Sequence, residues 1–84
     1  MDIRDATITE HAAGQMAKRE IPRGDVQRVL ALPDEVLDVR PGRVVAQAVL
    51  GHQLLRVFVD VDRHPPEVVT VYLTSKIDKY RSRP

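Results

Sequence analysis

Three turn signals divide the second half of the chain into four strand-like runs. Pro41-Gly42 and Gly51-His52 are two-residue turns, and residues 63–66 form a longer loop that contains two prolines. The runs between them are rich in valine and other strand-favouring residues. Connections this short join antiparallel neighbours, because a parallel pair needs a crossover of a dozen or more residues. The sequence therefore predicts an antiparallel meander with strands at 35–40, 43–50, 53–62 and 68–76.

The first half of the chain is typical of two helices. Thr9 is a suitable N-cap for a helix from Glu10 to Glu20, and a capping box formed by Thr7 and Glu10 is the alternative start. A second helix is expected over residues 25–31, after the break at Pro22. Apolar residues gather on one side of each helix: Ile8, Ala12, Ala13, Met16 and Ala17 for the first, and Val26, Val29 and Leu30 for the second.

Two helices followed by four strands predict an α+β fold with both helices on one face of a four-stranded antiparallel sheet. The length of 84 residues predicts one domain over residues 1–84, with its core at about 8–80 and a basic tail at 76–84. Because the chain has no cysteine, disulfides and thiolate metal sites are excluded. No apolar run approaches the ~20 residues of a membrane span and no signal peptide is recognisable, so we expect a cytoplasmic location without a membrane partner.

Alternation assigns the side chains of the last two strands to two faces. Toward the helices we expect Leu55, Val57, Val59 and Val61 from one strand, and Val69, Val71 and Leu73 from the other. The opposite face is expected to be open, with Leu54, Arg56, Phe58, Asp60 and Asp62 beside Val68, Thr70, Tyr72, Thr74 and Lys76. A guanidinium beside a phenol and hydroxyls favours a phosphate group. The alternative is a partly exposed face on which Arg56 merely stacks on an aromatic ring.

Two further groups of polar residues bear on function. His11, Gln15 and Arg19 recur every four residues and line one edge of the first helix, outside its apolar stripe. An imidazole there has the pKa range of a general acid or base. The three histidines lack the spacing of metal ligands, so we expect no metal. The net charge of +1 gives little support to nucleic-acid binding, and the basic tail is either a solvated end or a phosphate-facing segment.

Two motifs occur in a fixed order along the chain. Thr9-x-His11-Ala12-x-x-x-Met16-x-x-Arg19-x-Ile21 comes first, and Val69-Thr70-Val71-Tyr72 lies in the last strand. Between them stand Val26, Val29, Leu30, Pro33 and Leu55-Arg56-Val57. This combination, over roughly Ile8 to Tyr80, resembles the bacterial family called domain of unknown function 4258. That family looks related to the RelE-like and barnase-like toxin nucleases (the barnase–EndoU–colicin–RelE type), which share two N-terminal helices and a four-stranded antiparallel sheet.

The resemblance implies a metal-independent endoribonuclease without a cofactor, often the toxin of a toxin–antitoxin pair. Its implied partners are RNA, with or without the ribosome, an antitoxin protein and a second copy of the chain. The implied catalytic residues are His11, Arg19, Arg56 and Tyr72, and the implied substrate-binding residues are Gln15, Thr70, Thr74, Lys76 and Tyr80.

The implied reaction is attack of a ribose 2′-hydroxyl on the adjacent phosphorus, with His11 or Tyr72 as the base and Arg56 and Arg19 as stabilisers of the developing charge. It requires the imidazole of His11 to reach over the open face of the last strand. Two alternatives remain at the level of sequence. One is a non-catalytic interaction module that uses the same face or the sheet edge, and the other is a DNA-binding component of a toxin–antitoxin system.

Overall fold

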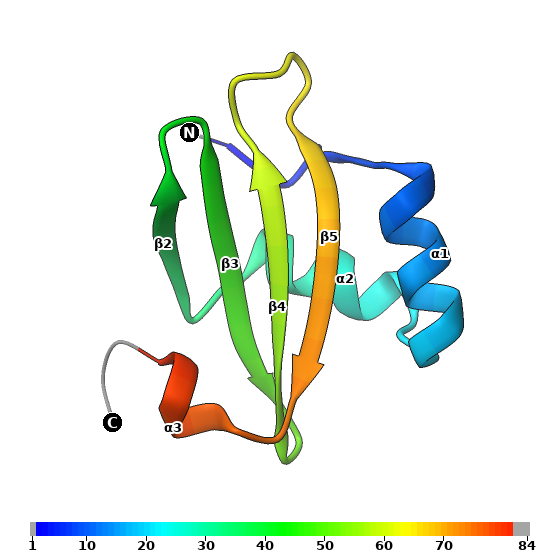
Figure 1. The fold of residues 1–84 in the computed structure, drawn as a ribbon, viewed down its shortest axis with the longest axis vertical. Coiled ribbons are helices and arrows are strands. Elements are labelled where there is room, and N and C mark those ends of the chain that lie inside the picture. Colours follow the sequence, from blue (N-terminus) through cyan, green and yellow to red (C-terminus); the bar gives the residue numbers. More distant parts are fainter. Residues whose placement is uncertain (1, 82–84) are drawn as a thin grey trace.

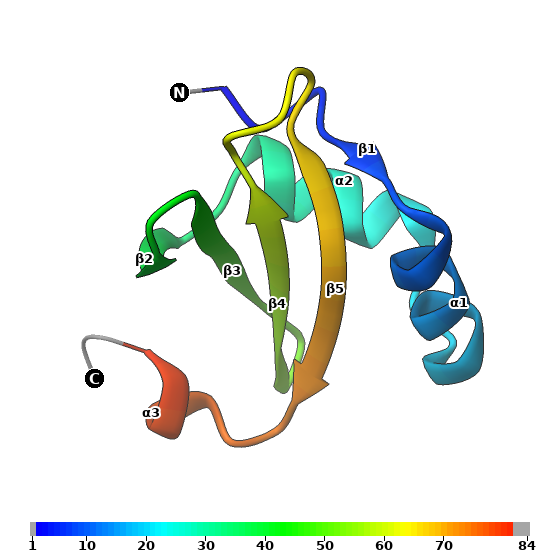
Figure 2. The same cartoon turned by 45° about the horizontal axis from the view of Figure 1, so that its top comes forward.

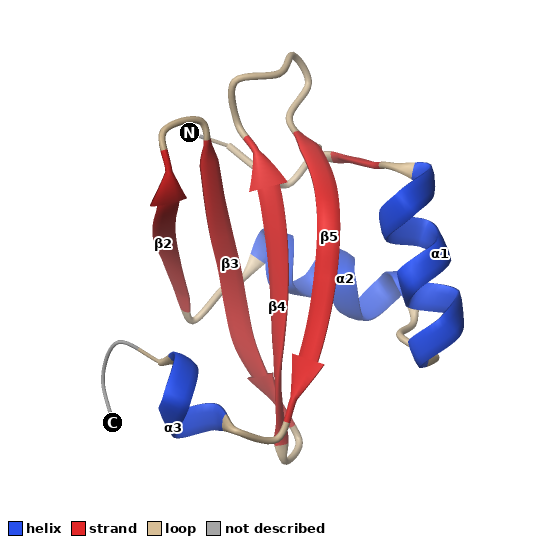
Figure 3. Cartoon of the chain, viewed as in Figure 1, coloured by secondary structure: helices blue, strands red, loops and turns tan. Residues whose placement is uncertain are grey.

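A computed structural model describes residues 2–81 of the chain. Its elements follow one another in the order shown in Figure 1 and coloured by type in Figure 3: β1 (Thr7–Ile8), α1 (Glu10–Arg19), α2 (Arg23–Ala31), β2 (Glu35–Arg40), β3 (Arg43–Leu50), β4 (Gln53–Asp60), β5 (Glu67–Thr74) and α3 (Ile77–Tyr80). Residues 82–84 of the predicted basic tail lie outside the described residues.

The sheet has five strands in the order β1-β5-β4-β3-β2. Strands β2 to β5 form the antiparallel meander that the turn signals predict, and the bounds of β2 and β3 are those expected. Gly42 and Gly51 occupy positive φ angles of 82° and 63° in the two tight turns, a conformation that glycine adopts without strain. The prediction of four strands is wrong, because the two-residue β1 pairs in parallel with the start of β5. A strand this short leaves no alternation to detect.

Both main helices lie on one face of the sheet, as the apolar stripes predict, and Figure 2 shows α2 crossing behind the strands. Their buried residues pack on the valine-rich sides of β3, β4 and β5, which face them: Ala12, Met16, Val26, Val29 and Leu30 meet Val44, Ala46, Leu55, Val57, Val59, Val68 and Val71. Burial of these aliphatic side chains is the main favourable contribution to folding, at about 1.5–3 kcal/mol for each fully buried residue.

The ends of the helices differ slightly from the prediction. Thr9 is the N-cap of α1, where its hydroxyl accepts a hydrogen bond from the Ala12 N–H, and the capping box at Thr7 does not form because Thr7 belongs to β1. The helix ends at Arg19, since Glu20 takes the left-handed conformation. Ala17, which was predicted to be buried, is exposed. Helix α2 starts two residues earlier than predicted, directly after Pro22, whose fixed φ suits a helix start.

A register shift in β5 overturns part of the predicted facing of that strand. Phe58 pairs with Thr70 but Val59 pairs with Val68, so Val69 is an extra residue on β5. Such a bulge reverses the alternation on its N-terminal side. Val68 is therefore buried under the helices, whereas Val69 is only half-buried. The strand also ends at Thr74, so Lys76 does not belong to it.

The opposite face of the sheet is not open, as was expected, because helix α3 lies over part of it (Figures 1 and 2). Residues 77–80, which belong to the predicted basic tail, fold back from β5 and bring Tyr80 against Arg56 and Tyr72. Gln47, Val45 and Leu54 are completely buried on this side. Strand β4 ends at Asp60, so Asp62 lies beyond it. We call this side of the sheet the α3 face.

Candidate functional site

Three polar residues stand opposite one another across the middle of the α3 face. Gln47 of β3 is the cross-strand partner of Arg56 of β4, which in turn is the partner of Tyr72 of β5. Directly opposed residues on neighbouring strands point to the same face and lie within contact distance. The predicted neighbourhood of Arg56 and Tyr72 is therefore confirmed, and the antiparallel register is what creates it.

Arg56 is surrounded by an amide and two aromatic rings. Its Nε–H donates a hydrogen bond of 2.9 Å to Gln47 Oε1. Its Cζ lies 4.4 Å from the ring centroid of Tyr80 and 5.2 Å from that of Phe58, distances at which the charge interacts with the π face. Within residues 2–81 Arg56 forms no ion pair. Burial lowers the pKa of Arg56, because loss of water disfavours its charge.

Gln47 is the buried residue that joins these groups, and the sequence prediction missed it. Its side chain is 0% exposed, and its Nε2 donates to Glu35 Oε1 and, over 3.0 Å, to the carbonyl oxygen of Tyr80. The amide thus links β2, β4 and α3 in a single network. The signal was present in the sequence, since Gln47 is the one polar residue between Val44 and Leu50. A buried amide must satisfy its donors and acceptor within the protein.

Two phenols complete the centre of the α3 face. The rings of Tyr72 and Tyr80 meet edge to face, with centroids 5.8 Å apart and planes at 80°. The pKa of Tyr80 is lowered, first by its side-chain hydrogen bond with Tyr72 and then by the nearby charge of Lys79. Lys79 Nζ lies 5.3 Å from the Tyr80 ring centroid. The environment therefore favours the phenolate form of Tyr80 relative to a free tyrosine.

Helix α1 contributes its predicted polar edge to the same region, because it runs beside β5 (Figures 1 and 2). Gln15 Oε1 accepts hydrogen bonds from the Thr70 hydroxyl and, over 3.0 Å, from the Val71 N–H, so it caps the outer edge of β5. One turn later the Arg19 Cζ lies 6.0 Å from the Tyr72 ring centroid. His11 is exposed in the first turn of α1, and its imidazole forms no hydrogen bond or ion pair with a described residue.

The remaining predicted substrate contacts lie at the junction between β5 and α3. Thr74 is buried, and its hydroxyl accepts a 3.0 Å hydrogen bond from the Lys76 N–H. The ammonium-bearing side chain of Lys76 is exposed. The structure thus brings Arg19, Arg56, Tyr72 and Tyr80 into one chain of contacts and Gln15 against Thr70, while Thr74 shapes the turn that leads to α3.

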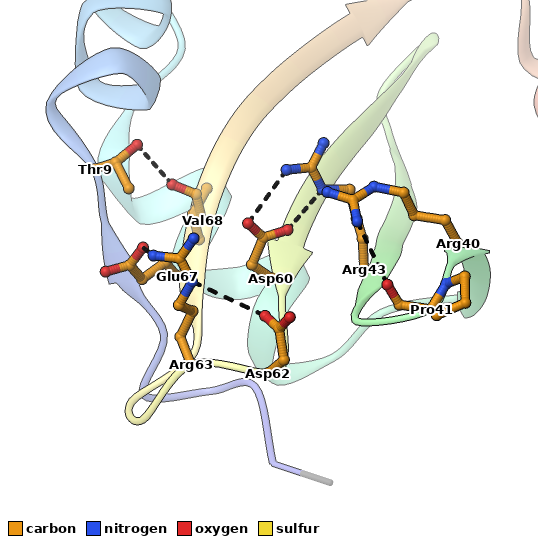
Figure 4. Close-up of polar contacts among 9 residues, drawn as sticks. All are labelled: Thr9, Arg40, Pro41, Arg43, Asp60, Asp62, Arg63, Glu67 and Val68. Atoms are coloured by element: carbon orange, nitrogen blue, oxygen red, sulfur yellow. Dashed lines mark hydrogen bonds and ion pairs between the residues drawn. The ribbon is translucent and has the colours of Figure 1, made fainter.

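An ion pair between Arg43 and Asp60 occupies the other end of the α3 face (Figure 4). Arg43 and Asp60 are cross-strand partners, and the guanidinium donates from Nε and Nη2 to the two carboxylate oxygens over 2.6 and 3.2 Å. The hydrogen bond from Arg43 lowers the pKa of Asp60, and the same contact raises the pKa of Arg43. This bidentate pair neutralises itself and leaves no unbalanced charge for a ligand.

Other features of the described chain lie away from this region. Two surface hollows flank β2, one of them lined by Ile3, Leu30, Pro33, Val36 and Val44, and neither contains a candidate residue. Within residues 2–81 no three histidine or acidic side chains are grouped closely enough to hold a metal ion. None of the described helices has the length and apolar character needed to cross a bilayer.

Comparison with known proteins assigns the chain to a family through its sequence. No curated protein and no solved structure matches it significantly. A family model, however, matches residues 8–73, a stretch that contains α1, α2, β2, β3 and β4, and β5 up to Leu73. The match includes His11, Arg19, Arg56 and Tyr72. The chain therefore belongs to the family described as Domain of unknown function (DUF4258).

Proposed function

We propose that the protein is a metal-independent endoribonuclease that binds the phosphate backbone of RNA at the α3 face. The observation that carries this proposal is the state of Arg56, a partly desolvated guanidinium that forms no ion pair with any of residues 2–81. A desolvated cation is expensive to maintain and interacts strongly with an anion that reaches it. Arg19, joined to Arg56 through the contacts of Tyr72 and Tyr80, adds a second cation on the same side.

The order of the elements supports the same proposal. The RelE-like and barnase-like nucleases that the family resembles have two N-terminal helices and then four antiparallel strands. Here α1 and α2 precede the antiparallel strands β2 to β5, and β1 is an addition at the edge. By this likeness the protein is proposed to be the toxin of a toxin–antitoxin pair, with an antitoxin as its protein partner.

The proposed reaction needs a base, a stabiliser of negative charge and an acid. His11 or Tyr72 removes the proton of a ribose 2′-hydroxyl, and the oxygen attacks the adjacent phosphorus. The bond to the 5′-oxygen breaks, a second group protonates that oxygen, and the products are a 2′,3′-cyclic phosphate and a 5′-hydroxyl. Arg56 and Arg19 stabilise the extra charge of the phosphorane. An imidazole suits the base at neutral pH because its ordinary pKa is near 6.5, whereas that of a phenol is near 10.

Cleavage of a single-stranded RNA tests this function directly. The wild-type protein should produce fragments with 2′,3′-cyclic phosphate ends at a rate that a metal chelator does not change. Arg56→Ala and His11→Ala should each lower the rate about 100-fold or more, the scale of losing one charge-stabilising or proton-transferring group. The exposed residues Arg63 and His52 provide matched controls, since Arg63→Ala and His52→Ala should cleave at the wild-type rate. Wild-type cleavage by both site variants, or none by the wild-type protein, would contradict the assignment.

A second candidate function is supported by a different surface. Leu32, Val36 and Val39 are 73%, 47% and 46% exposed, and all three lie on or next to β2, the outer strand of the sheet. An outer strand with exposed apolar residues can accept an added strand from a partner protein. In that case a stable one-to-one complex should form without RNA cleavage, and Val36→Lys should disrupt it. RNA cleavage by the purified chain alone would exclude a purely non-catalytic role.

A further inference from the structure

Helix α3 is the least anchored element of the site, yet it holds the aromatic ring that lies nearest to the Arg56 guanidinium. It is a single turn over Ile77–Tyr80 in which no residue is fully buried. Its described contacts with the sheet come from Tyr80: the ring lies against Arg56 and Tyr72, and the carbonyl oxygen accepts from Gln47. Elements with few buried contacts open locally at much lower cost than the whole fold.

We propose that α3 is a detachable cover, and that RNA reaches Arg56 by displacing Tyr80. This inference rests on the proposed function and assigns the regulation of that same site. Three groups contact the Arg56 guanidinium: Gln47, Phe58 and Tyr80. Gln47 and Phe58 belong to strands in the middle of the sheet and cannot withdraw without disrupting it. Tyr80 is the one group of the three that can leave.

The charge of the cover supports displacement by an anion. Lys76, Lys79 and Arg81 carry three cations in and beside α3, against the single acid Asp78. The described contacts that hold this basic segment over the desolvated arginine are those of aromatic rings and one hydrogen bond, from Gln47 to the Tyr80 carbonyl oxygen, and such contacts are individually weak. A phosphate backbone interacts favourably with both Arg56 and the released cations, so it binds the uncovered state better. A ligand shifts an equilibrium only through such a difference in affinity.

The cover can first be tested without RNA, by the rate at which trypsin cleaves the folded protein after Lys76. This bond adjoins α3 and lies away from position 80, so Tyr80→Ala does not alter its local sequence. Tyr80→Ala should be cleaved about threefold faster or more, because the uncovered state becomes more populated. Asp62→Asn, a change at an exposed side chain in the loop between β4 and β5, is the control and should be cleaved after Lys76 at nearly the wild-type rate. Equal rates in wild type and Tyr80→Ala would overturn the cover.

The second test uses a fluorescent single-stranded oligonucleotide with 2′-O-methyl riboses, which cannot be cleaved by 2′-hydroxyl attack. Tyr80→Ala should bind it about threefold or more tightly than wild type, because the apparent affinity is reduced by the covered fraction. A saturating amount of the oligonucleotide should also accelerate hydrogen exchange of the Arg81 N–H in the wild-type protein, because this group is bonded to the Ile77 carbonyl oxygen only while α3 is formed.

The opposite results identify α3 as part of the RNA-binding surface itself, the role that the sequence predicts for Tyr80. Weaker binding by Tyr80→Ala, or slower hydrogen exchange of the Arg81 N–H with the oligonucleotide bound, would therefore overturn displacement. Absence of binding by both proteins would contradict the proposed RNA function and its ligand at the cover. Equal trypsin rates without RNA contradict the cover alone, so the two failures are distinguishable.

Discussion

Two arginines lie on the same face of the same sheet, and the structure treats them in opposite ways. Arg43, at one end, is bound by both oxygens of Asp60, and this contact raises its pKa. Arg56, in the middle, contacts a neutral amide and two aromatic rings, and burial lowers its pKa. A charge paired directly with a carboxylate contributes to folding. Arg56 is partly desolvated, its hydrogen bond and ring contacts are with neutral groups, and the Glu35 carboxylate acts on it only through the intervening Gln47 amide and at longer range, so its guanidinium remains available for an anion.

The comparison also separates stability from function within one face. The neighbours of Arg43 are a buried carboxylate and the turn at Pro41-Gly42, where a Cβ on Gly42 would come within 2.7 Å of an Asp62 oxygen. The neighbours of Arg56 come from four different elements: β3, β4, β5 and α3. Convergence of chemically capable side chains from several elements is typical of a site, whereas a local pair within one hairpin is typical of a structural contact.

The largest effect on stability should come from removing the ion pair between Arg43 and Asp60. Asp60→Asn removes the negative charge while it keeps the shape, so the guanidinium loses its counter-ion at a position where the carboxylate side chain is only 9% exposed. We expect a loss of about 1–3 kcal/mol in the free energy of unfolding, measured by urea denaturation at neutral pH. Asp62→Asn is the matched control, because that side chain is 65% exposed, and it should change the value by less than about 0.5 kcal/mol. Similar losses in the two variants would break the distinction.

The same pair predicts an acid dependence with a definite sign. Because Arg43 lowers the pKa of Asp60 in the folded state, the folded protein binds fewer protons here than the unfolded chain does. The contribution is therefore fully present above the unfolded pKa of about 4 and is lost as the pH falls through the lowered folded value. The difference in stability between wild type and Asp60→Asn should shrink over this acid range. Asp2, whose pKa is lowered to about 2 first by its hydrogen bond with Arg4, contributes equally to both proteins. A constant difference from neutral pH to pH of about 2 would contradict this interpretation.

The sequence predicts the β2–β3 hairpin and misses the bulge for a physical reason. The Pro41-Gly42 turn fixes the end of β2 and the start of β3, and the alternation of side chains indicates that both segments are strands. In β5 the adjacent residues Val68 and Val69 are chemically identical, so composition cannot show which one is the extra residue. Helix α3 was missed because a single turn has no periodicity to detect, and it forms through contacts of Tyr80 with distant strands.

The site was predictable to the extent that it depends on register. Arg56 and Tyr72 meet because the β4–β5 pairing is the expected one, and the spacing of Gln15 and Arg19 follows from the helical repeat. Gln47 stands out in the sequence as the one polar residue of an apolar run, but its links to Glu35, Arg56 and Tyr80 depend on strand register and on α3, which the sequence did not reveal. The catalytic role predicted for His11 remains a prediction. Its imidazole is exposed, and only a bound substrate would give it a group to act on.

The smallest expected effect is the gain in folding stability when inorganic phosphate binds to Arg56. Inorganic phosphate at roughly five times its dissociation constant should stabilise the wild-type protein by about 1 kcal/mol, because it binds the folded state and not the unfolded chain. Arg56→Met should lose this stabilisation, since it removes the guanidinium that lacks an ion-pair partner among residues 2–81. Arg43→Met should keep it, although its starting stability is lower. The shift in thermal midpoint is measured against sodium chloride of the same ionic strength, which separates binding from general screening. Equal stabilisation of Arg56→Met and wild type would show that the anion binds elsewhere, and that the lack of a counter-ion at Arg56 does not make it a ligand site.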